Sequence, residues 1–131
     1  MPAKLLTGKE VAQKMDQDIQ KEVQELKAKG INPTLKIVIA GDAPDSLAYA
    51  NSAKKIAEKN GILCDIEQLP GSTSQDDFVK TLKQRNADKG ANGIIVMRPL
   101  PKQISEDVVK YVLAPEKDID CFNPVNAGKV M

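Results

Sequence analysis

The chain has 131 residues, enough for one domain with a real hydrophobic core but too few for a second full domain. Its 19 Lys and Arg residues nearly balance its 18 Asp and Glu residues, and aromatic residues make up only 3% of the chain, so we expect neither nucleic acid nor a membrane surface as a partner. Histidine is absent, and the two cysteines, Cys64 and Cys121, lie far apart, which predicts no metal site and two free thiols.

The amino-terminal segment predicts an amphipathic helix without a targeting signal. It lacks the apolar stretch of a secretion signal, and no later run approaches the roughly 20 apolar residues of a membrane-spanning helix, so we expect a soluble, cytoplasmic protein. Thr7-Gly-Lys-Glu10 has the form of a capping box, which predicts the helix start. Apolar residues then recur at helical spacing up to Gly30, and we expect them to pack in the core rather than to bind a partner: Val11, Met15, Ile19, Val23 and Leu26.

Three segments predict strands: residues 35–40 and 93–97 indicate buried strands, and residues 62–69 alternate in part between apolar and polar residues. A helix from about Ser46 to Asn60 follows the first strand. Gly61 then suits the left-handed residue that closes a helix.

The second half of the chain predicts two further helices. Ser74-Gln-Asp-Asp77 is a second capping box, and Ser105 caps a short helix that Pro115 halts. The last stretch, residues 123–131, has no clear period. Because strands alternate with helices, right-handed crossovers are expected, and we predict an α/β fold: a three-layer αβα domain with a mainly parallel sheet.

The loops that follow parallel strands meet at one edge of a sheet, where open α/β folds bind their ligands. We therefore expect residues 41–46, 70–74 and 98–101 to lie near one another and to contain the candidate site. Within the last of these loops, Pro99-Leu-Pro101 is rigid and suits a pocket wall, with a plain exit turn as the alternative.

A charged cluster near the carboxyl terminus, Pro115-Glu-Lys-Asp-Ile-Asp120, holds two carboxylates spaced by one residue. In extended backbone Asp118 and Asp120 point to opposite sides, so only one of them can face the site. A solvated loop is the alternative interpretation of this cluster.

Four motifs in this order resemble the bifunctional methylenetetrahydrofolate dehydrogenase/cyclohydrolase family. The first, which runs from Gly41 to Lys55, is similar to the family's Gly, short polar loop, Ser, two residues, Tyr, three residues and Lys. The other three are Gly93-Ile-Ile-Val-Met-Arg-Pro-Leu-Pro101, similar to Gly-x-x-Val-Gln-x-Pro-Leu-Pro; Pro115-Glu-Lys-Asp-Ile-Asp120, similar to Pro-Glu-Lys-Asp-Val-Asp-Gly; and Asn126-Ala-Gly128.

The resemblance implies one-carbon folate interconversion. The family oxidises 5,10-methylenetetrahydrofolate to methenyltetrahydrofolate with NAD(P) and hydrolyses the product to 10-formyltetrahydrofolate, chemistry that feeds purine biosynthesis. By this resemblance, residues 1–122 are a folate-binding catalytic domain, and residues 123–131 begin the connection to a missing NAD(P)-binding Rossmann domain. NADP or NAD would be bound mainly by that domain, because these residues contain no G-x-G-x-x-G. Tetrahydrofolate derivatives and a second copy of the chain, in a homodimer, are the implied partners.

The resemblance also implies the roles of site residues. In the family a tyrosine stacks on the pterin-like ring, a lysine acts in acid/base chemistry, a glutamine tunes that lysine, and an aspartate holds the pterin amino group. The matching positions hold Tyr49, Ala53, Met97 and Asp120, so the lysine and the glutamine are both replaced. The predicted substrate-binding set is completed by Ser46, Pro99 and Leu100.

Replacement of the lysine predicts weak or absent cyclohydrolase activity, because loss of a positioned acid/base group costs about 10²–10⁴ in rate. Lys54 and Lys55 lie about 140° and 240° around the helix from Tyr49, so neither should reach its face. Two alternatives stay open: a non-catalytic folate-binding or dimerisation module, and an unrelated flavodoxin-like or receiver-like domain.

Overall fold

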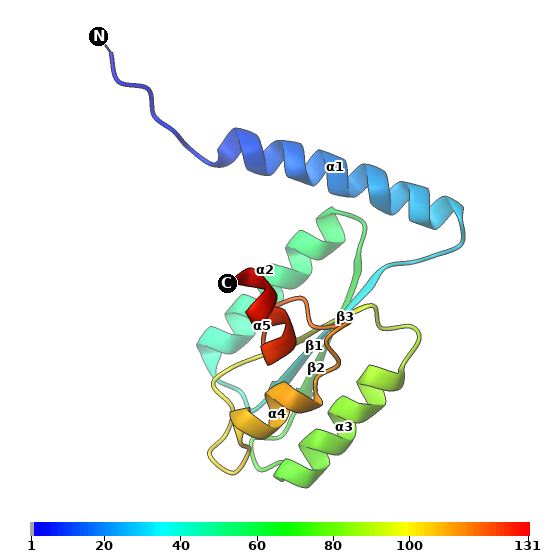
Figure 1. Cartoon of the computed structure of the whole chain (residues 1–131), viewed down its shortest axis with the longest axis vertical. Coiled ribbons are helices and arrows are strands. Elements are labelled where there is room, and N and C mark those ends of the chain that lie inside the picture. Colours follow the sequence, from blue (N-terminus) through cyan, green and yellow to red (C-terminus); the bar gives the residue numbers. More distant parts are fainter. Residues whose placement is uncertain (1) are drawn as a thin grey trace.

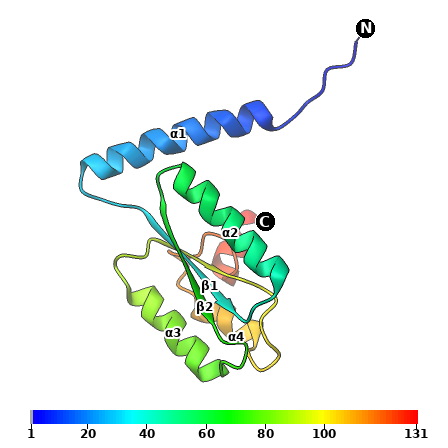
Figure 2. The same cartoon turned by 180° about the vertical axis from the view of Figure 1, so that it is seen from behind.

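The computed structural model describes residues 2–131. A parallel sheet lies at its centre, with β1 (Thr34–Ala40) between β2 (Leu63–Leu69) and β3 (Gly93–Val96). The helices are α1 (Lys9–Ala28), α2 (Pro44–Lys59), α3 (Gln75–Ala87), α4 (Glu106–Val112) and α5 (Pro124–Val130). One face of the sheet packs against α2 and the other against α3 and α4 (Figures 1 and 2), which confirms the predicted three-layer αβα fold.

Alternation along β1 builds two separate cores. Successive side chains of a strand point to opposite faces, so Ile37 and Val38, both fully buried, belong to different apolar clusters. Ile37 packs with the α2 side, and Val38 packs with Phe78 of α3 and Val109 of α4. All four residues of β3 are buried, as expected for a strand covered on both faces.

Two of the three helix starts predicted from side-chain caps are confirmed. The Ser74 hydroxyl accepts a hydrogen bond from the backbone N–H of Asp77 at 3.1 Å, and the Ser105 hydroxyl accepts one from Val108. Gly61, just after α2, has a φ of 81°, the left-handed conformation that suits glycine. These local signals place the loops that follow β1, β2 and β3.

Helix α1 departs from the prediction at both its start and its apolar face. It begins at Lys9 with Gly8 as the N-cap and without a side-chain cap, so Thr7 does not form the expected capping box. Of its residues only Val23 is buried, whereas Val11, Met15 and Ile19 are exposed, so the expectation that the stripe packs in the core is wrong.

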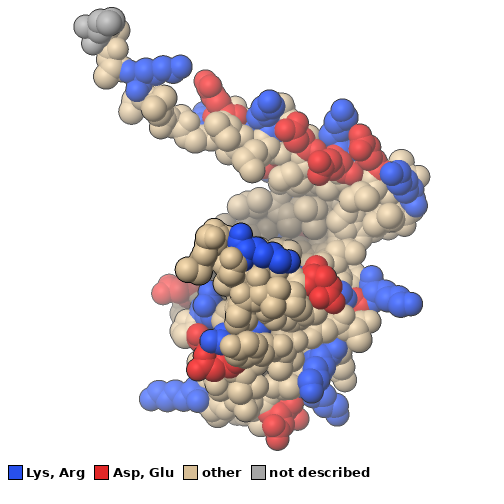
Figure 3. Space-filling view, viewed as in Figure 1, with Lys and Arg blue, Asp and Glu red and all other residues tan. Residues whose placement is uncertain are grey.

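The position of α1 explains this difference. The helix extends beyond the sheet and meets the rest of the described chain at the end of α2, where Gln20 donates to Asn60 and Asp16 pairs with Lys59. Figure 3 shows charged side chains on its outer side and uncharged ones facing a hollow between α1 and the remaining layers. Helical spacing of apolar residues predicts an amphipathic helix, but it does not specify what covers the apolar face.

The carboxyl-terminal stretch is also more regular than its sequence suggests, because residues 124–130 form α5. The Asn123 side chain accepts a hydrogen bond from the backbone N–H of Val125 at 2.9 Å, and Pro124 occupies the first turn. The Asn126 side chain ties the helix to the carbonyl oxygen of Pro115. A helix of only seven residues is too short for a period to be recognised in its sequence.

Candidate functional site

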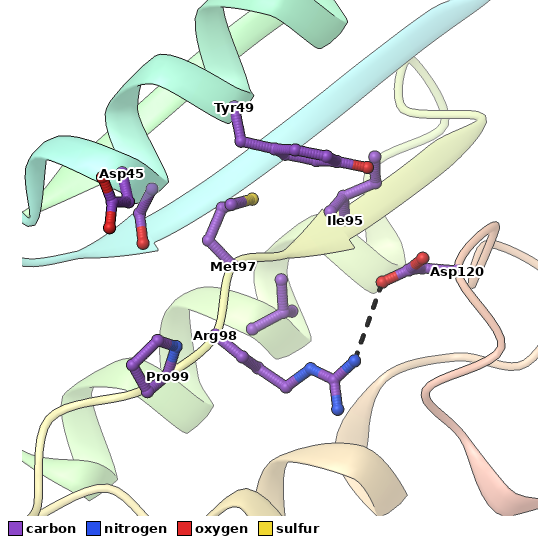
Figure 4. Close-up of a pocket in the computed structure, with 9 residues that line it drawn as sticks. Asp45, Tyr49, Ile95, Met97, Arg98, Pro99 and Asp120 are labelled. Atoms are coloured by element: carbon purple, nitrogen blue, oxygen red, sulfur yellow. Dashed lines mark ion pairs between the residues drawn. The ribbon is translucent and has the colours of Figure 1, made fainter.

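A pocket of about 360 Å³ opens at the carboxyl edge of the sheet (Figure 4). It is formed by the first turns of α2, by β3 with the loop that follows, and by one residue from the carboxyl-terminal segment. The lining residues are Asp45, Ser46, Tyr49, Ile95, Val96, Met97, Arg98, Pro99 and Asp120. Five residues predicted for the site therefore meet here, although they come from distant parts of the chain.

The three loops predicted to converge do so, but only two of them line the pocket. A Cβ atom added to Gly41 would lie 3.8 Å from the Cα atom of Gly71, which brings the loops after β1 and β2 together. The side chain of Gln103 donates to the carbonyl oxygens of Gly71 and Thr73, at 2.7 and 2.9 Å. The loop at residues 70–74 thus supports its two neighbours from outside the pocket.

Helix α2 contributes an aromatic wall. Ser46 and Tyr49 are three residues apart on one helical face, so both line the pocket. Ser46 is buried, whereas the Tyr49 side chain is exposed and extends over the pocket, with Met97 below its ring in Figure 4. Together with Ile95 the ring and the thioether form an apolar cleft that suits a flat heterocycle.

Asp118 stabilises the turn that brings Asp120 to the pocket. A parallel bridge pairs Asp118 with Ile94 beside β3, and the buried Asp118 carboxylate accepts backbone hydrogen bonds from Asp120, Phe122 and Asn123, the last at 2.7 Å. Asp118 therefore fixes the turn, and Asp120 faces the pocket, in agreement with the expectation that only one carboxylate can do so.

The turn that carries Asp120 contains a third departure from the family pattern, after Ala53 and Met97. Cys121 stands where that pattern has glycine, and its φ of 56° lies in the left-handed region, which costs a residue with a side chain about 1 kcal/mol. Cys121 is exposed, and both cysteines are free thiols. Burial raises the pKa of the other thiol, Cys64, which is part of the core.

The two replaced positions lie in an apolar environment. Met97 is 9% exposed and belongs to the cluster on the α2 face of the sheet, and Ala53 is partly buried against the same cluster. Lys54 pairs instead with Glu58, at 3.9 Å, and neither Lys54 nor Lys55 lines the pocket. No lysine of the described residues lines this pocket, so its α2 side has no side chain suited to proton transfer by an amine.

Arg98 lines the pocket, although the sequence predicted only its loop, residues 98–101, as part of the site and not Arg98 itself as a functional residue. Its Nη2 atom lies 4.0 Å from Oδ2 of Asp120, and its guanidinium carbon lies 4.6 Å from the centre of the Phe122 ring. Arg98 stands between Met97 and Pro99, at a position that the family pattern leaves open, so the motif itself carried no signal for it. The Arg98 guanidinium and the Asp120 carboxylate lie together, across the pocket from Tyr49 (Figure 4).

In the proline loop after β3, one predicted site residue lines the pocket and another packs in the core. Pro99 lines the pocket, as expected of a rigid wall. Leu100 packs against the apolar cluster on the α3 and α4 face and does not line the pocket.

Two further observations concern metal ions and membranes. Within residues 2–131, no group of three or more His, Cys, Asp or Glu side chains is arranged to hold a metal ion. In the same part of the chain, no helix combines the length and the apolar character needed to cross a membrane.

Comparison with known proteins agrees with the motifs. Residues 6–120 match the family model for the tetrahydrofolate dehydrogenase/cyclohydrolase catalytic domain. The chain is 48% identical over 126 residues to the bifunctional protein FolD of Alkaliphilus metalliredigens, covering 96% of this chain and 44% of that protein. The chain thus spans about half the length of the curated relatives it matches.

Solved structures lead to the same family. The crystal structure of the bifunctional enzyme FolD from Campylobacter jejuni is 32% identical, with a TM-score of 0.89 over 94% of this chain and 44% of that one. The FolD of Trypanosoma brucei, complexed with NADP and an inhibitor, is 31% identical, with a TM-score of 0.88 over 99% of this chain and 45% of that one. These matches leave no support for an unrelated flavodoxin-like or receiver-like domain. The chain therefore belongs to the tetrahydrofolate dehydrogenase/cyclohydrolase family, whose catalytic-domain model it matches over most of its length.

Proposed function

We propose that the pocket binds the pterin ring of a tetrahydrofolate derivative and that this chain is the folate-binding domain of a FolD-type protein of one-carbon metabolism. The observation that carries the proposal is that Tyr49 and Asp120, far apart in sequence, line one pocket. The tyrosine ring offers a stacking face, and the carboxylate can accept hydrogen bonds from an amino group at the edge of the heterocycle. Ser46 and Pro99 complete the wall.

The same pocket is poorly equipped for cyclohydrolysis. Opening of methenyltetrahydrofolate by water needs a group that moves protons, and the two positions that supply it in the family hold Ala53 and Met97 here. Arg98 does not replace an amine in this role, because a guanidinium stays protonated at all ordinary pH values. We therefore propose that this chain binds folate with cyclohydrolase activity that is weak or absent.

Oxidation of methylenetetrahydrofolate would require NADP or NAD, and a dinucleotide does not fit the residues described. The loop from β1 to α2 holds a single glycine, Gly41, followed by Asp42, and the first turn of α2 adds Asp45, where a pyrophosphate would need backbone N–H groups and positive potential. We propose that the cofactor is bound mainly outside these residues, that residues 1–122 form the folate domain, and that residues 123–131 begin the connection to the cofactor domain. A cytoplasmic homodimer that supplies purine biosynthesis belongs to the same proposal and rests on the resemblance alone.

A second candidate is a folate-binding or dimerisation module without catalysis. The joint replacement of the lysine by Ala53 and of the glutamine by Met97 favours it, because two changes at one catalytic pair point to a site released from its chemistry. The two candidates differ in a version of the chain extended by an NAD(P)-binding domain. Oxidation of methylenetetrahydrofolate by that version supports the enzyme, and binding without turnover supports the module.

Calorimetric titration of the 131-residue chain with 5-formyltetrahydrofolate tests folate binding. We expect saturable binding that Asp120→Asn weakens by about tenfold or more, because hydrogen bonds to a charged acceptor contribute about 1.5–3 kcal/mol. Asp42→Asn is the matched control, since Asp42 is exposed on the same sheet edge but does not line the pocket. Absence of binding, or equal affinity of the native chain and Asp120→Asn, would contradict the proposal.

A further inference from the structure

We propose that Arg98 is a specificity residue, which recognises an oxygen acceptor beside the amino group held by Asp120. This inference rests on the proposed function and extends it, because it names the chemical edge that the pocket selects. The ligand class is a ring that carries an amino group and an oxo group on one edge, as in a 2-amino-4-oxopyrimidine.

The Arg98 guanidinium is held in position while its N–H donors remain available to a ligand. Nη2 of Arg98 lies 4.0 Å from the Asp120 carboxylate, beyond the 2.7–3.2 Å typical of a hydrogen bond, so this contact does not use up an N–H donor. On another side the guanidinium carbon lies 4.6 Å from the centre of the Phe122 ring, which restricts its position. About half of the Arg98 side chain is exposed, and the residue lines the pocket, so a ligand can reach its donors.

Arg98 and Asp120 together present a donor beside an acceptor. An ionised carboxylate only accepts hydrogen bonds, and a guanidinium only donates them. A ring edge that carries an amino donor, a ring N–H and then an oxo acceptor matches both groups. A ring with amino groups at both positions would place an N–H against the Arg98 donors and leave them unpaired, which is the situation that discriminates strongly between analogues.

The position of Arg98 separates recognition from chemistry. Its guanidinium lies beside Asp120 and Phe122, whereas the replaced catalytic positions belong to the apolar cluster against α2. A guanidinium also cannot exchange a proton with substrate near neutral pH. Arg98 therefore influences which ring the pocket binds, and it does not change the rate of proton transfer.

The test compares folic acid with aminopterin near neutral pH, where both rings are uncharged. The first has an oxo group at position 4 and an N–H at position 3, and the second has an amino group at position 4 and a ring nitrogen without hydrogen at position 3. Calorimetry on the native chain should give at least about tenfold tighter binding of the 4-oxo ligand. Arg98→Leu should reduce the affinity ratio severalfold, and any preference that remains comes from the N–H at position 3, which only the 4-oxo ring can donate to Asp120. Lys102→Leu is the matched control for the lost charge, because Lys102 is exposed and lies outside the pocket, and it should keep the native ratio.

Two results would overturn the inference while folate binding stands: a ratio unchanged in Arg98→Leu, or tighter binding of folic acid by Arg98→Leu, which would mean that Arg98 only obstructs Asp120. Guanosine carries the same amino and oxo edge without the rest of a folate. Binding of guanosine that depends on Arg98, with no binding of either folate, would support edge recognition and contradict the proposed function. If the native chain binds none of the three compounds, both proposals fail.

Discussion

The two sides of the pocket differ in chemical character. The α2 side combines the Tyr49 ring with the thioether of Met97, and Asp45 adds a carboxylate at the first turn of the helix; Ala53 packs against the apolar cluster and does not line the pocket. The opposite side carries the charges of Arg98 and Asp120. Recognition of a heterocycle needs a stacking face and an edge of donors and acceptors, both of which are present, whereas cyclohydrolysis needs a group that moves protons. This difference underlies our proposal that binding and chemistry depend on separable parts of one site.

The largest expected effect is on the rate of hydrolysis, and it comes from restoring the family's lysine and glutamine at positions 53 and 97. Ala53→Lys combined with Met97→Gln should raise the rate of methenyltetrahydrofolate hydrolysis by about 10²–10⁴ over the native chain, the usual contribution of a positioned acid/base group. The measurement is the loss of the methenyl absorbance with time. Ala53→Lys alone should give part of this gain, because the added lysine would then lack the hydrogen-bond partner that tunes it.

Ala53→Met is the matched control, since it adds an unbranched side chain without an amine. If the control increases hydrolysis as much as the lysine variant does, or if the double variant remains at the rate of the buffer blank, then Ala53 and Met97 do not account for the weak cyclohydrolase activity that we propose.

The apolar side should also contribute to stability. Met97→Gln is expected to lower the free energy of unfolding by about 1–2 kcal/mol, because it places an amide in a nearly buried apolar cluster without a partner. Urea unfolding measures this change, and Met97→Leu, which keeps the apolar volume, should cost less. Equal stability of Met97→Gln and the native chain would indicate that the position is polar and hydrated.

A smaller effect, on stability, should distinguish the Arg98–Asp120 pair in the pocket from the Arg85–Glu67 pair, which lies outside it. Nε and Nη2 of Arg85 donate to Glu67 at 2.5 and 2.8 Å, and these hydrogen bonds lower the pKa of the Glu67 carboxyl. A lowered folded-state pKa stabilises the protein above the unfolded value of about 4.3, and this stabilisation is lost as the pH falls through the folded value.

Glu67→Gln should therefore lower the free energy of unfolding by about 1 kcal/mol near pH 7, with the difference from the native chain fading toward about pH 3. Asp120→Asn should change stability less, because its partner is 4.0 Å away and both side chains are about half exposed. Urea unfolding at several pH values measures both variants. A larger stability loss in Asp120→Asn than in Glu67→Gln would assign the pocket pair to the fold instead of to a ligand.

Features with a local physical signal were predictable from the sequence. Strands β1 and β3 follow from largely apolar runs and β2 from partial alternation, and Ser74 and Ser105 mark helix starts because their hydroxyls satisfy backbone donors nearby. The meeting of Tyr49 with Asp120 also followed, since parallel strands end at a common edge and the family motifs identify the residues.

Features that depend on tertiary surroundings were not predictable. The apolar stripe of α1, which includes Val11 and Met15, has the spacing of a core helix, yet its exposure depends on where the helix leaves the sheet. Arg98 enters the site through its approach to Asp120 and Phe122, which are distant in sequence. The buried role of Asp118 likewise requires the backbone N–H groups of a turn that no periodicity describes.

The separation of binding from chemistry is tested most directly by incubating the native chain with methenyltetrahydrofolate at a concentration that saturates the pocket by titration. We predict saturable binding together with hydrolysis at the rate of the buffer blank. Hydrolysis well above the blank that disappears in Tyr49→Ala would contradict the account, because it would show that this pocket performs the chemistry without the lysine and the glutamine.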